Sequence, residues 1–185
     1  MNNKFFSDYF NFMEIAMASV NHDDLIAAAE KIQAVSQKGK KLIIAGNGGS
    51  AAMASHVSVD FTKAAGIRAI NFNEADLLTC FANDYGYERV FEKAVDFYSD
   101  EGDLLILVSS SGNSVNVVNA AKRAKELNIS VITFTGFKSD NPLRNLGDIN
   151  FWVNSKGYNI VEMTHHIWLL AIVDYIIGDI HYSAN

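Results

Sequence analysis

The fold of this chain can be predicted from one stretch, Lys41-Leu-Ile-Ile-Ala-Gly-Asn-Gly-Gly-Ser-Ala-Ala52. Its apolar run, residues 42–45, is typical of a strand buried on both faces. The run stops at Gly46, where three glycines in four positions permit positive φ and close approach of a ligand. Ser50 then favours the N-cap of a helix. A strand, a glycine turn and a helix start suit an anion such as phosphate. The alternative is a tight turn that closes a βα unit without a ligand.

The composition describes one globular domain, expected over residues 1–185. The chain is 49% apolar and 19% charged, with a net charge of −6, so neither nucleic acid nor an anionic membrane surface is an expected partner. The single cysteine, Cys80, excludes an internal disulfide and fits a reducing compartment. The start of the chain lacks the apolar stretch of a signal peptide, and no uninterrupted apolar run of about 18 residues predicts a membrane span. We therefore expect a cytoplasmic protein.

Two helices are expected before the first strand, over residues 5–37, with a break near residues 20–24. Both carry apolar residues at helical spacing. We expect this helical extension, residues 1–38, to pack across the sheet or against another subunit, because two extra helices do not fit inside a small α/β core. The α/β core is expected over residues 40–180.

The rest of the chain alternates strand and helix patterns, which predicts a doubly wound parallel sheet of the α/β class. After the first strand, further strands are expected at residues 67–72, 104–108, 130–135 and 149–153. Helices are expected at residues 51–64, 77–83, 89–98, 115–127 and 160–177. The last helix is apolar almost all round, which favours burial in a subunit interface.

A second polar loop, Ser109-Ser-Ser-Gly-Asn-Ser114, follows the apolar strand at 104–108 and precedes a helix. Ligands of open α/β sheets bind at the carboxyl ends of the strands, and hydroxyls with helix-start amides can hold a phosphate dianion without lysine or arginine. Gly112 lets the loop curl. The alternative is a flexible loop that ends in an ordinary N-cap. The hydroxyls of the expected phosphate cradle come from Ser109, Ser110, Ser111 and Ser114.

These two loops, together with Asn83-Asp-Tyr-Gly-Tyr-Glu88, resemble the sugar isomerase (SIS) domain family, and more narrowly its phosphoheptose isomerase branch. The resemblance covers nearly the whole chain. It implies a five-stranded parallel sheet flanked by helices. It also implies a homotetramer with active sites between neighbouring subunits. The implied reaction converts sedoheptulose 7-phosphate, a phosphorylated sugar, to a heptose 7-phosphate for bacterial surface polysaccharide.

The resemblance also implies roles for individual residues. Asp60 stands where the isomerases have a glutamate that acts as base, and His56 falls on a zinc ligand of the family, so zinc is a candidate cofactor. Their i, i+4 spacing places both on one helix face, which suits half of a metal site or a base with a partner. A buried histidine and a surface acid are the alternative. The residues that match substrate contacts outside the serine loop are Asn47, Gly48, Gly49, Ser50, Asn83 and Asp84.

The last helix departs from the family pattern. The isomerases carry a Gln-Glu pair at its start and a histidine seven residues after the Glu. Here Glu162 matches and is an expected substrate contact, but Val161 stands at the Gln position and Leu169 at the histidine position. Leucine cannot supply the acid that an aldose–ketose isomerisation needs.

Two interpretations are open at this point. Either His165 or His166, one turn earlier, takes the histidine role, or the acid and the metal site are lost and the chain binds a sugar phosphate without turnover. Adjacent residues point about 100° apart on a helix, so only one of the two can face a given site. We expect His165 to act as the acid, with Asp60 as a base one methylene shorter than the family glutamate, on a cis-enediol route.

Three functions are therefore compared. The leading hypothesis is an isomerase of a seven-carbon ketose phosphate. The second is a non-catalytic SIS module that binds a sugar phosphate or a protein partner such as a replication initiator. The third is an aldose–ketose reaction on another sugar. Hydroxyls and amides distinguish phosphate better than carbon stereochemistry, so the sequence does not identify the sugar.

Overall fold

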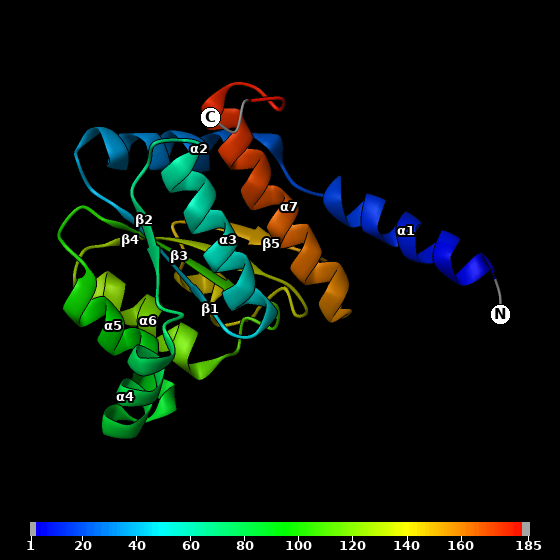
Figure 1. Ribbon diagram of the computed structural model, residues 1–185. Helices are drawn as coiled ribbons and strands as arrows, with labels where there is room; N and C mark the ends of the chain where they lie inside the picture. Colours follow the sequence, from blue (N-terminus) through cyan, green and yellow to red (C-terminus); the bar gives the residue numbers. More distant parts are fainter. Residues whose placement is uncertain (1–2, 183–185) are drawn as a thin grey trace.

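The computed structural model describes residues 3–182, which contain one five-stranded, fully parallel sheet (Figure 1). The spatial order is β2-β1-β3-β4-β5, so the chain reverses direction across the sheet between β1 and β3. This reversal is the point at which open α/β sheets bind ligands. The predicted α/β class and five-stranded sheet are confirmed. The strands are β1 (Leu42–Gly46), β2 (Ala69–Asn71), β3 (Leu104–Ser109), β4 (Ser130–Thr135) and β5 (Ile149–Trp152).

The helices follow the predicted order, with ends that differ by a few residues. Two short 3-10 turns, η1 and η2, lie between these elements. The elements are α1 (Asn3–Met17), α2 (His22–Gln37), α3 (Gly49–Lys63), α4 (Ala75–Tyr85), η1 (Tyr87–Arg89), α5 (Val90–Tyr98), α6 (Val115–Glu126), η2 (Arg144–Leu146) and α7 (Tyr158–Ile177).

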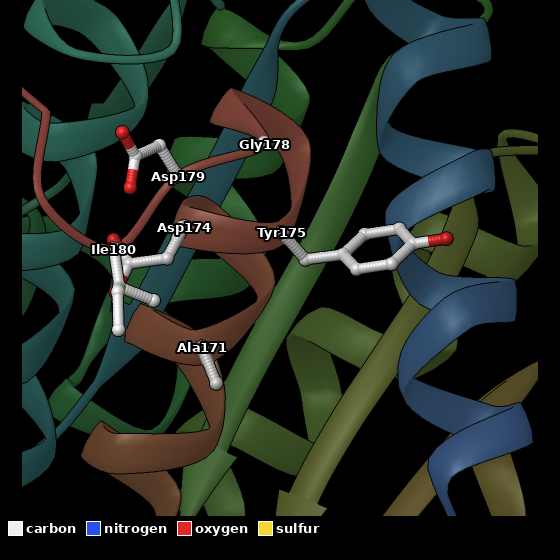
Figure 2. Close-up of a pocket in the computed structure, with 6 residues that line it drawn as sticks. All are labelled: Ala171, Asp174, Tyr175, Gly178, Asp179 and Ile180. Carbon is white, nitrogen blue, oxygen red and sulfur yellow. The ribbon is translucent and has the colours of Figure 1, made fainter.

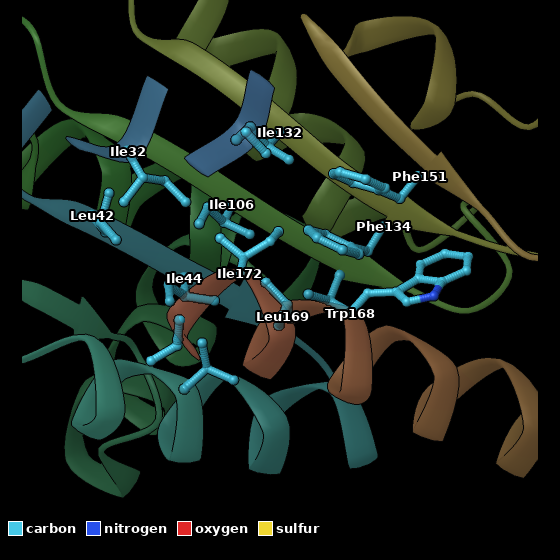
Figure 3. Close-up of a cluster of buried hydrophobic side chains, with 14 of the residues drawn as sticks. Ile32, Leu42, Ile44, Ile106, Ile132, Phe134, Phe151, Trp168, Leu169 and Ile172 are labelled. Carbon is cyan, nitrogen blue, oxygen red and sulfur yellow. The ribbon is translucent and has the colours of Figure 1, made fainter. Parts of the chain in front are cut away.

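Each face of the sheet has its own apolar core. Because strand side chains alternate, Leu42 and Ile44 point to the cluster under α2, α3 and α7, whereas Ile43 and Ala45 point to the cluster under α5 and α6. Figure 3 shows the first cluster, in which Leu169 of α7 lies among the strand side chains. β1 and β3 are buried along their whole length, which explains their continuous apolar runs.

The two N-terminal helices have different surroundings. α2 buries one face, including Ile32, against α7 and β5, and Asn21 caps its start by accepting from the Asp23 amide at 3.0 Å. α1 extends away from the body and is anchored at its end, where Trp168 Nε1 donates to the Met17 carbonyl at 2.9 Å (Figure 1). Thus α2 packs across the sheet, while much of the apolar surface of α1 is uncovered within the chain.

α7 is long and apolar enough to cross a membrane by length and composition alone, with a mean hydropathy of 1.4. Its packing identifies it instead as a core helix, because one face is buried against β4 and the neighbouring helices α2 and α3. The opposite side carries exposed apolar residues, among them Met163, Ile167 and Tyr175. The N-terminal end of α7 reaches the carboxyl edge of the sheet, where the polar loops lie.

Candidate functional site

The glycine turn and the serine loop lie together around one small polar cavity of about 120 Å³ at the carboxyl ends of β1 and β3. Whole ligand sites for drug-sized molecules usually occupy several hundred Å³. The cavity therefore has room for a small anionic group rather than for a complete sugar phosphate. It is lined by Asn47, Ser50, Ser109, Ser110, Ser111, Ser114, Tyr158 and Glu162.

The glycine turn is required by close packing. A Cβ on Gly46 would lie 2.6 Å from the Ser50 Cβ and 2.7 Å from the Val108 carbonyl oxygen, and Gly48 has a φ of +56°. The amides of Ser50 and Ala51 at the start of α3 donate within the turn, to the carbonyls of Asn47 and Gly48. These two amides are therefore paired within the turn, and the side-chain groups that line the cavity are mainly hydroxyls.

The serine loop holds one buried hydroxyl that has no partner. Among the described residues, Ser110 Oγ is buried without a hydrogen bond, whereas Ser109 Oγ donates to Ser114 Oγ at 3.2 Å. The loop is fixed from outside, because the Gly136 amide donates to the Ser110 carbonyl and the Leu143 amide to the Gly112 carbonyl. A buried hydroxyl without a partner costs free energy, and Ser110 lines the cavity, so a bound anion would satisfy it.

α7 adds two residues to the cavity. The Glu162 carboxylate lies so close to Gly49 that a side chain at position 49 would collide with it. A carboxylate repels a phosphate dianion, so Glu162 suits sugar hydroxyls or a proton better than the phosphate itself. The sequence analysis did not identify Tyr158, which has no distinctive motif around it.

His165 does not lie at this site. Its side chain is fully buried, packs against Phe134 and Trp168, and donates from Nε2 to the Thr135 carbonyl at 2.9 Å. Its Nδ1 has no partner among residues 3–182, and burial lowers the pKa of the imidazole to about 4. The prediction that His165 is the catalytic histidine is wrong, because this face of α7 turns toward the sheet.

His166 points to the other side, toward α3. Its Nε2 lies 2.9 Å from His56 Nδ1, and His56 Nε2 lies 3.3 Å from the Asp60 carboxylate. One of the two facing ring nitrogens donates and the other accepts, according to the tautomers of the two rings. Burial lowers the pKa of His166, the neighbouring His56 lowers it further, and Asp60 opposes both effects. The three side chains form one chain of contacts between α7 and α3, with a hydrogen bond between the two histidines and an ion-pair distance between His56 and Asp60.

In this arrangement the three side chains contact one another rather than surround a common centre. Within residues 3–182, no group of three His, Cys, Asp or Glu side chains is arranged to hold a metal ion. The two facing nitrogens of His56 and His166 are 2.9 Å apart, whereas two nitrogens on a tetrahedral zinc lie about 3.3 Å apart at bond lengths of about 2.0–2.1 Å. A zinc ion at His56 and Asp60 stays a prediction, and no chemistry is assigned to it.

The two positions that depart from the family pattern lie in the core. Val161 and Leu169 are fully buried, and Val161 packs so closely on Gly136 that a Cβ there would come within 2.7 Å of it. Neither position faces the polar cavity.

Asn83 and Asp84 do not line the cavity. Both are exposed on α4, where Asn83 Nδ2 donates to Asp84 Oδ1 at 2.9 Å. Tyr87, from the same motif, reaches the site instead, and its hydroxyl donates to Asn47 Oδ1 at 2.9 Å. The sequence analysis missed Tyr87, although the quoted motif contains it, and it missed Asn116, which pairs with Asn47.

A larger hollow, of about 660 Å³, lies at the other end of α7. Figure 2 shows its lining side chains, including Asp174, Tyr175 and Asp179, which point in different directions rather than toward one centre. Burial raises the pKa of Asp174. Asp174 is twelve residues beyond Glu162, or about 18 Å along the helix, so this hollow is separate from the serine-lined cavity.

The fold and the cavity define a doubly wound α/β protein with a small polar pocket at the topological switch point. The SIS domain family model matches residues 5–136. The phosphoheptose isomerase of Fusobacterium nucleatum is 36% identical over 151 residues, which cover 79% of this chain and 77% of the relative. The probable phosphoheptose isomerase of Thermoplasma acidophilum is 35% identical over 157 residues, covering 81% and 85%. This chain belongs to the SIS domain family.

Solved structures agree with this assignment. The phosphoheptose isomerase GmhA from Neisseria gonorrhoeae superposes with a TM-score of 0.87 at 28% identity, over 95% of this chain and 96% of that one. A phosphoheptose isomerase from Francisella tularensis superposes with a TM-score of 0.86 at 25% identity, over 96% of both chains. The N-terminal helical extension and α7 are therefore included in the shared architecture.

Proposed function

We propose that this protein is a phosphosugar isomerase that converts sedoheptulose 7-phosphate to a heptose 7-phosphate. The observation that carries the proposal is that α3 and α7 each supply residues to the serine-lined cavity and also carry the His166–His56–Asp60 chain between them. Membership of the SIS family, with phosphoheptose isomerases as relatives over most of the chain, supports the same reaction.

The serine loop is the proposed phosphate site. Its four serines line the cavity, and the buried Ser110 hydroxyl lacks a partner that a phosphate oxygen would provide. The small volume of the cavity, about 120 Å³, leaves the carbon chain of the sugar outside it. Glu162 lines the cavity, and His166 follows it by four residues, so the histidine chain begins about 6 Å farther along α7. A phosphorylated sugar held by its phosphate can therefore reach the histidines with its other end.

The proposed chemistry is proton transfer. A proton leaves C1 of the ketose and one is delivered to O2, which gives the enediol; the O1 proton then leaves and C2 takes up a proton. These steps need a base and a proton carrier near the substrate oxygens, but no oxidant. Asp60 and the two histidines act as one unit in this proposal, and His166 takes the role expected for His165. The lowered pKa of His166 favours the neutral ring, which has one N–H to donate and one nitrogen that accepts, so it can deliver a proton to one substrate oxygen and take one from another.

The direct test is turnover of sedoheptulose 7-phosphate, followed by the proton NMR signals of the aldose product. We expect the purified protein to form the aldose, with and without a chelator, and Asp60→Asn to abolish the reaction. His22→Ala, which changes an exposed histidine at the start of α2, is the matched control and should keep full activity. A reaction that stops on chelation and returns with zinc would reinstate the metal at His56 and Asp60.

A second candidate function is a non-catalytic SIS module. The buried Val161 and Leu169 favour it, because they replace the Gln and His of the isomerases and lie in the core. Tight binding of sedoheptulose 7-phosphate without any aldose product would support this module and exclude the enzyme.

We also propose a homotetramer located in the cytoplasm, with a role in bacterial surface polysaccharide synthesis. The exposed aromatic face of α1 supports assembly, since Phe5, Phe6 and Phe10 are each more than 60% exposed on a helix that extends from the body. Light scattering coupled to gel filtration should give a tetramer for the wild type and smaller species for Phe6→Ser/Phe10→Ser. A wild-type monomer would overturn the proposed assembly.

A further inference from the structure

Two asparagines join the glycine turn to the helix that follows the serine loop. Asn47 Nδ2 donates to Asn116 Oδ1 and Asn116 Nδ2 donates to Asn47 Oδ1, both at 2.9 Å. Asn47 follows β1 and lines the cavity, whereas Asn116 lies in the first turn of α6, is only 3% exposed and does not line it. The pair therefore holds the glycine turn and the start of α6 together through a residue, Asn116, that does not line the cavity.

The orientation of both amides is determined by one backbone group. A reciprocal amide pair would be equally well bonded if both side chains were flipped. The Val117 amide, which is shared between Asn116 Oδ1 and the Ser114 carbonyl at 3.0 Å each, breaks this symmetry, because an N–H group cannot accept. Asn116 must then present its NH₂ group to Asn47, and Asn47 must present its oxygen in return.

Tyr87 is a second residue that holds the Asn47 amide. Its hydroxyl donates to Asn47 Oδ1 at 2.9 Å, so this oxygen accepts from both Tyr87 and Asn116. An amide oxygen has two lone pairs and an amide nitrogen carries two hydrogens. Within residues 3–182, Asn47 Nδ2 donates only to Asn116. Asn47 therefore has one N–H left for a ligand, and no acceptor.

We propose that Asn116 and Tyr87 are positioning residues that hold Asn47 so that it meets the substrate as an N–H donor. This inference rests on the proposed phosphosugar site and deepens it, because neither residue touches the cavity itself. A donor at this position favours phosphate or hydroxyl oxygens. Without the pair, the amide of Asn47 can rotate and present its oxygen, which would repel an anion.

The test is a double-mutant cycle on anion binding, measured by calorimetry with inorganic phosphate and, separately, with sedoheptulose 7-phosphate. We expect Asn116→Ala to raise Kd about tenfold and Tyr87→Phe about threefold in the wild-type background. In the Asn47→Ala background both changes should be smaller than twofold, since the group that they orient is gone. If each substitution raised Kd equally in the two backgrounds, Asn116 and Tyr87 would not act through Asn47, and the inference would be overturned.

Asn119→Ala is the matched control, because Asn119 lies one turn farther along α6 and donates to the Glu88 carbonyl rather than to Asn47. It should leave Kd within twofold. If Asn116→Ala does not fold, Tyr87→Phe carries the same test, since Tyr87 is exposed and loses only its hydroxyl. Under the proposal, KM should rise in both variants with kcat changed less.

The outcomes separate the two proposals. The phosphate Kd values could follow the expected double-mutant cycle while the protein shows no isomerase activity. This result would support the positioning role and reject the enzyme. Isomerase activity with additive losses would reject the positioning role alone. Absence of both phosphate and sugar phosphate binding in the wild type would reject both.

Discussion

The two faces of α7 place adjacent histidines in opposite environments. His165 lies toward the sheet, fully buried, with a carbonyl as its one hydrogen-bond partner. His166 lies toward α3, partly exposed, and contacts a second histidine that leads to a carboxylate. The same side chain is thus a structural element on one face and a candidate proton carrier on the other. Residue type alone does not distinguish these roles, because solvent access and partners decide the chemistry.

The largest expected effect is on isomerase activity, when His165 and His166 are substituted one at a time. His166→Ala should lower kcat/KM for sedoheptulose 7-phosphate by about 10²–10⁴-fold, the usual contribution of a general acid or base. Its melting temperature should change little. His165→Gln should keep most of the activity, because a glutamine amide can still donate to the Thr135 carbonyl. The reverse pattern of activities would mean that the comparison of the two faces is wrong.

The free energy of unfolding should fall more for substitution of His165 than for substitution of His166. His165→Ala removes a fully buried side chain and leaves a cavity beside Phe134 and Trp168, so we expect the free energy of unfolding to fall by about 2–4 kcal/mol. His166→Ala should cost less than about 1 kcal/mol. Urea denaturation of the two variants and the wild type provides the measurement, and similar losses at both positions would contradict the assignment.

The buried His165 should also make the free energy of unfolding depend on pH. The pKa of His165 is lowered from 6.5 to about 4, so below pH 6.5 the unfolded chain binds a proton that the folded chain does not. Stability from this group is therefore complete above pH 6.5 and decreases as the pH falls toward 4, by about 3 kcal/mol in all. His165→Gln should lose less stability than the wild type between pH 7 and pH 4. Parallel curves for the two proteins would show that this ring does not titrate as expected.

The smallest expected effect concerns a second buried polar atom without a partner. Both His165 Nδ1 and Ser110 Oγ lack hydrogen bonds, but only Ser110 lines the cavity. Ser110→Ala should weaken inorganic phosphate binding about three- to tenfold without loss of stability, because the hydroxyl that it removes is unpaired in the free protein. Ser139→Ala, outside the cavity, is the control. Unchanged phosphate affinity in Ser110→Ala would remove this hydroxyl from the site.

Local sequence patterns were sufficient for the fold. The continuous apolar runs at Leu42–Gly46 and Leu104–Ser109 identified strands covered on both faces, and their alternation with helices required a parallel sheet. The loops after these strands could also be predicted as neighbours, because the carboxyl ends of adjacent parallel strands meet at one edge. The short strand β2 and the ends of α4 were placed only within a few residues, since these elements bury little apolar surface.

The sequence by itself determined the class of fold, the polar loops and the family, because periodicity, glycine turns and strand ends are local properties of the chain. Only the tertiary structure decided which histidine faces α3, since that depends on the rotation of α7 against the sheet. It also decided that Asn47 is held by Asn116, 69 residues away along the chain, and by Tyr87. Contacts of this kind join segments with no shared pattern, and they form only when the packing of the core brings the segments together.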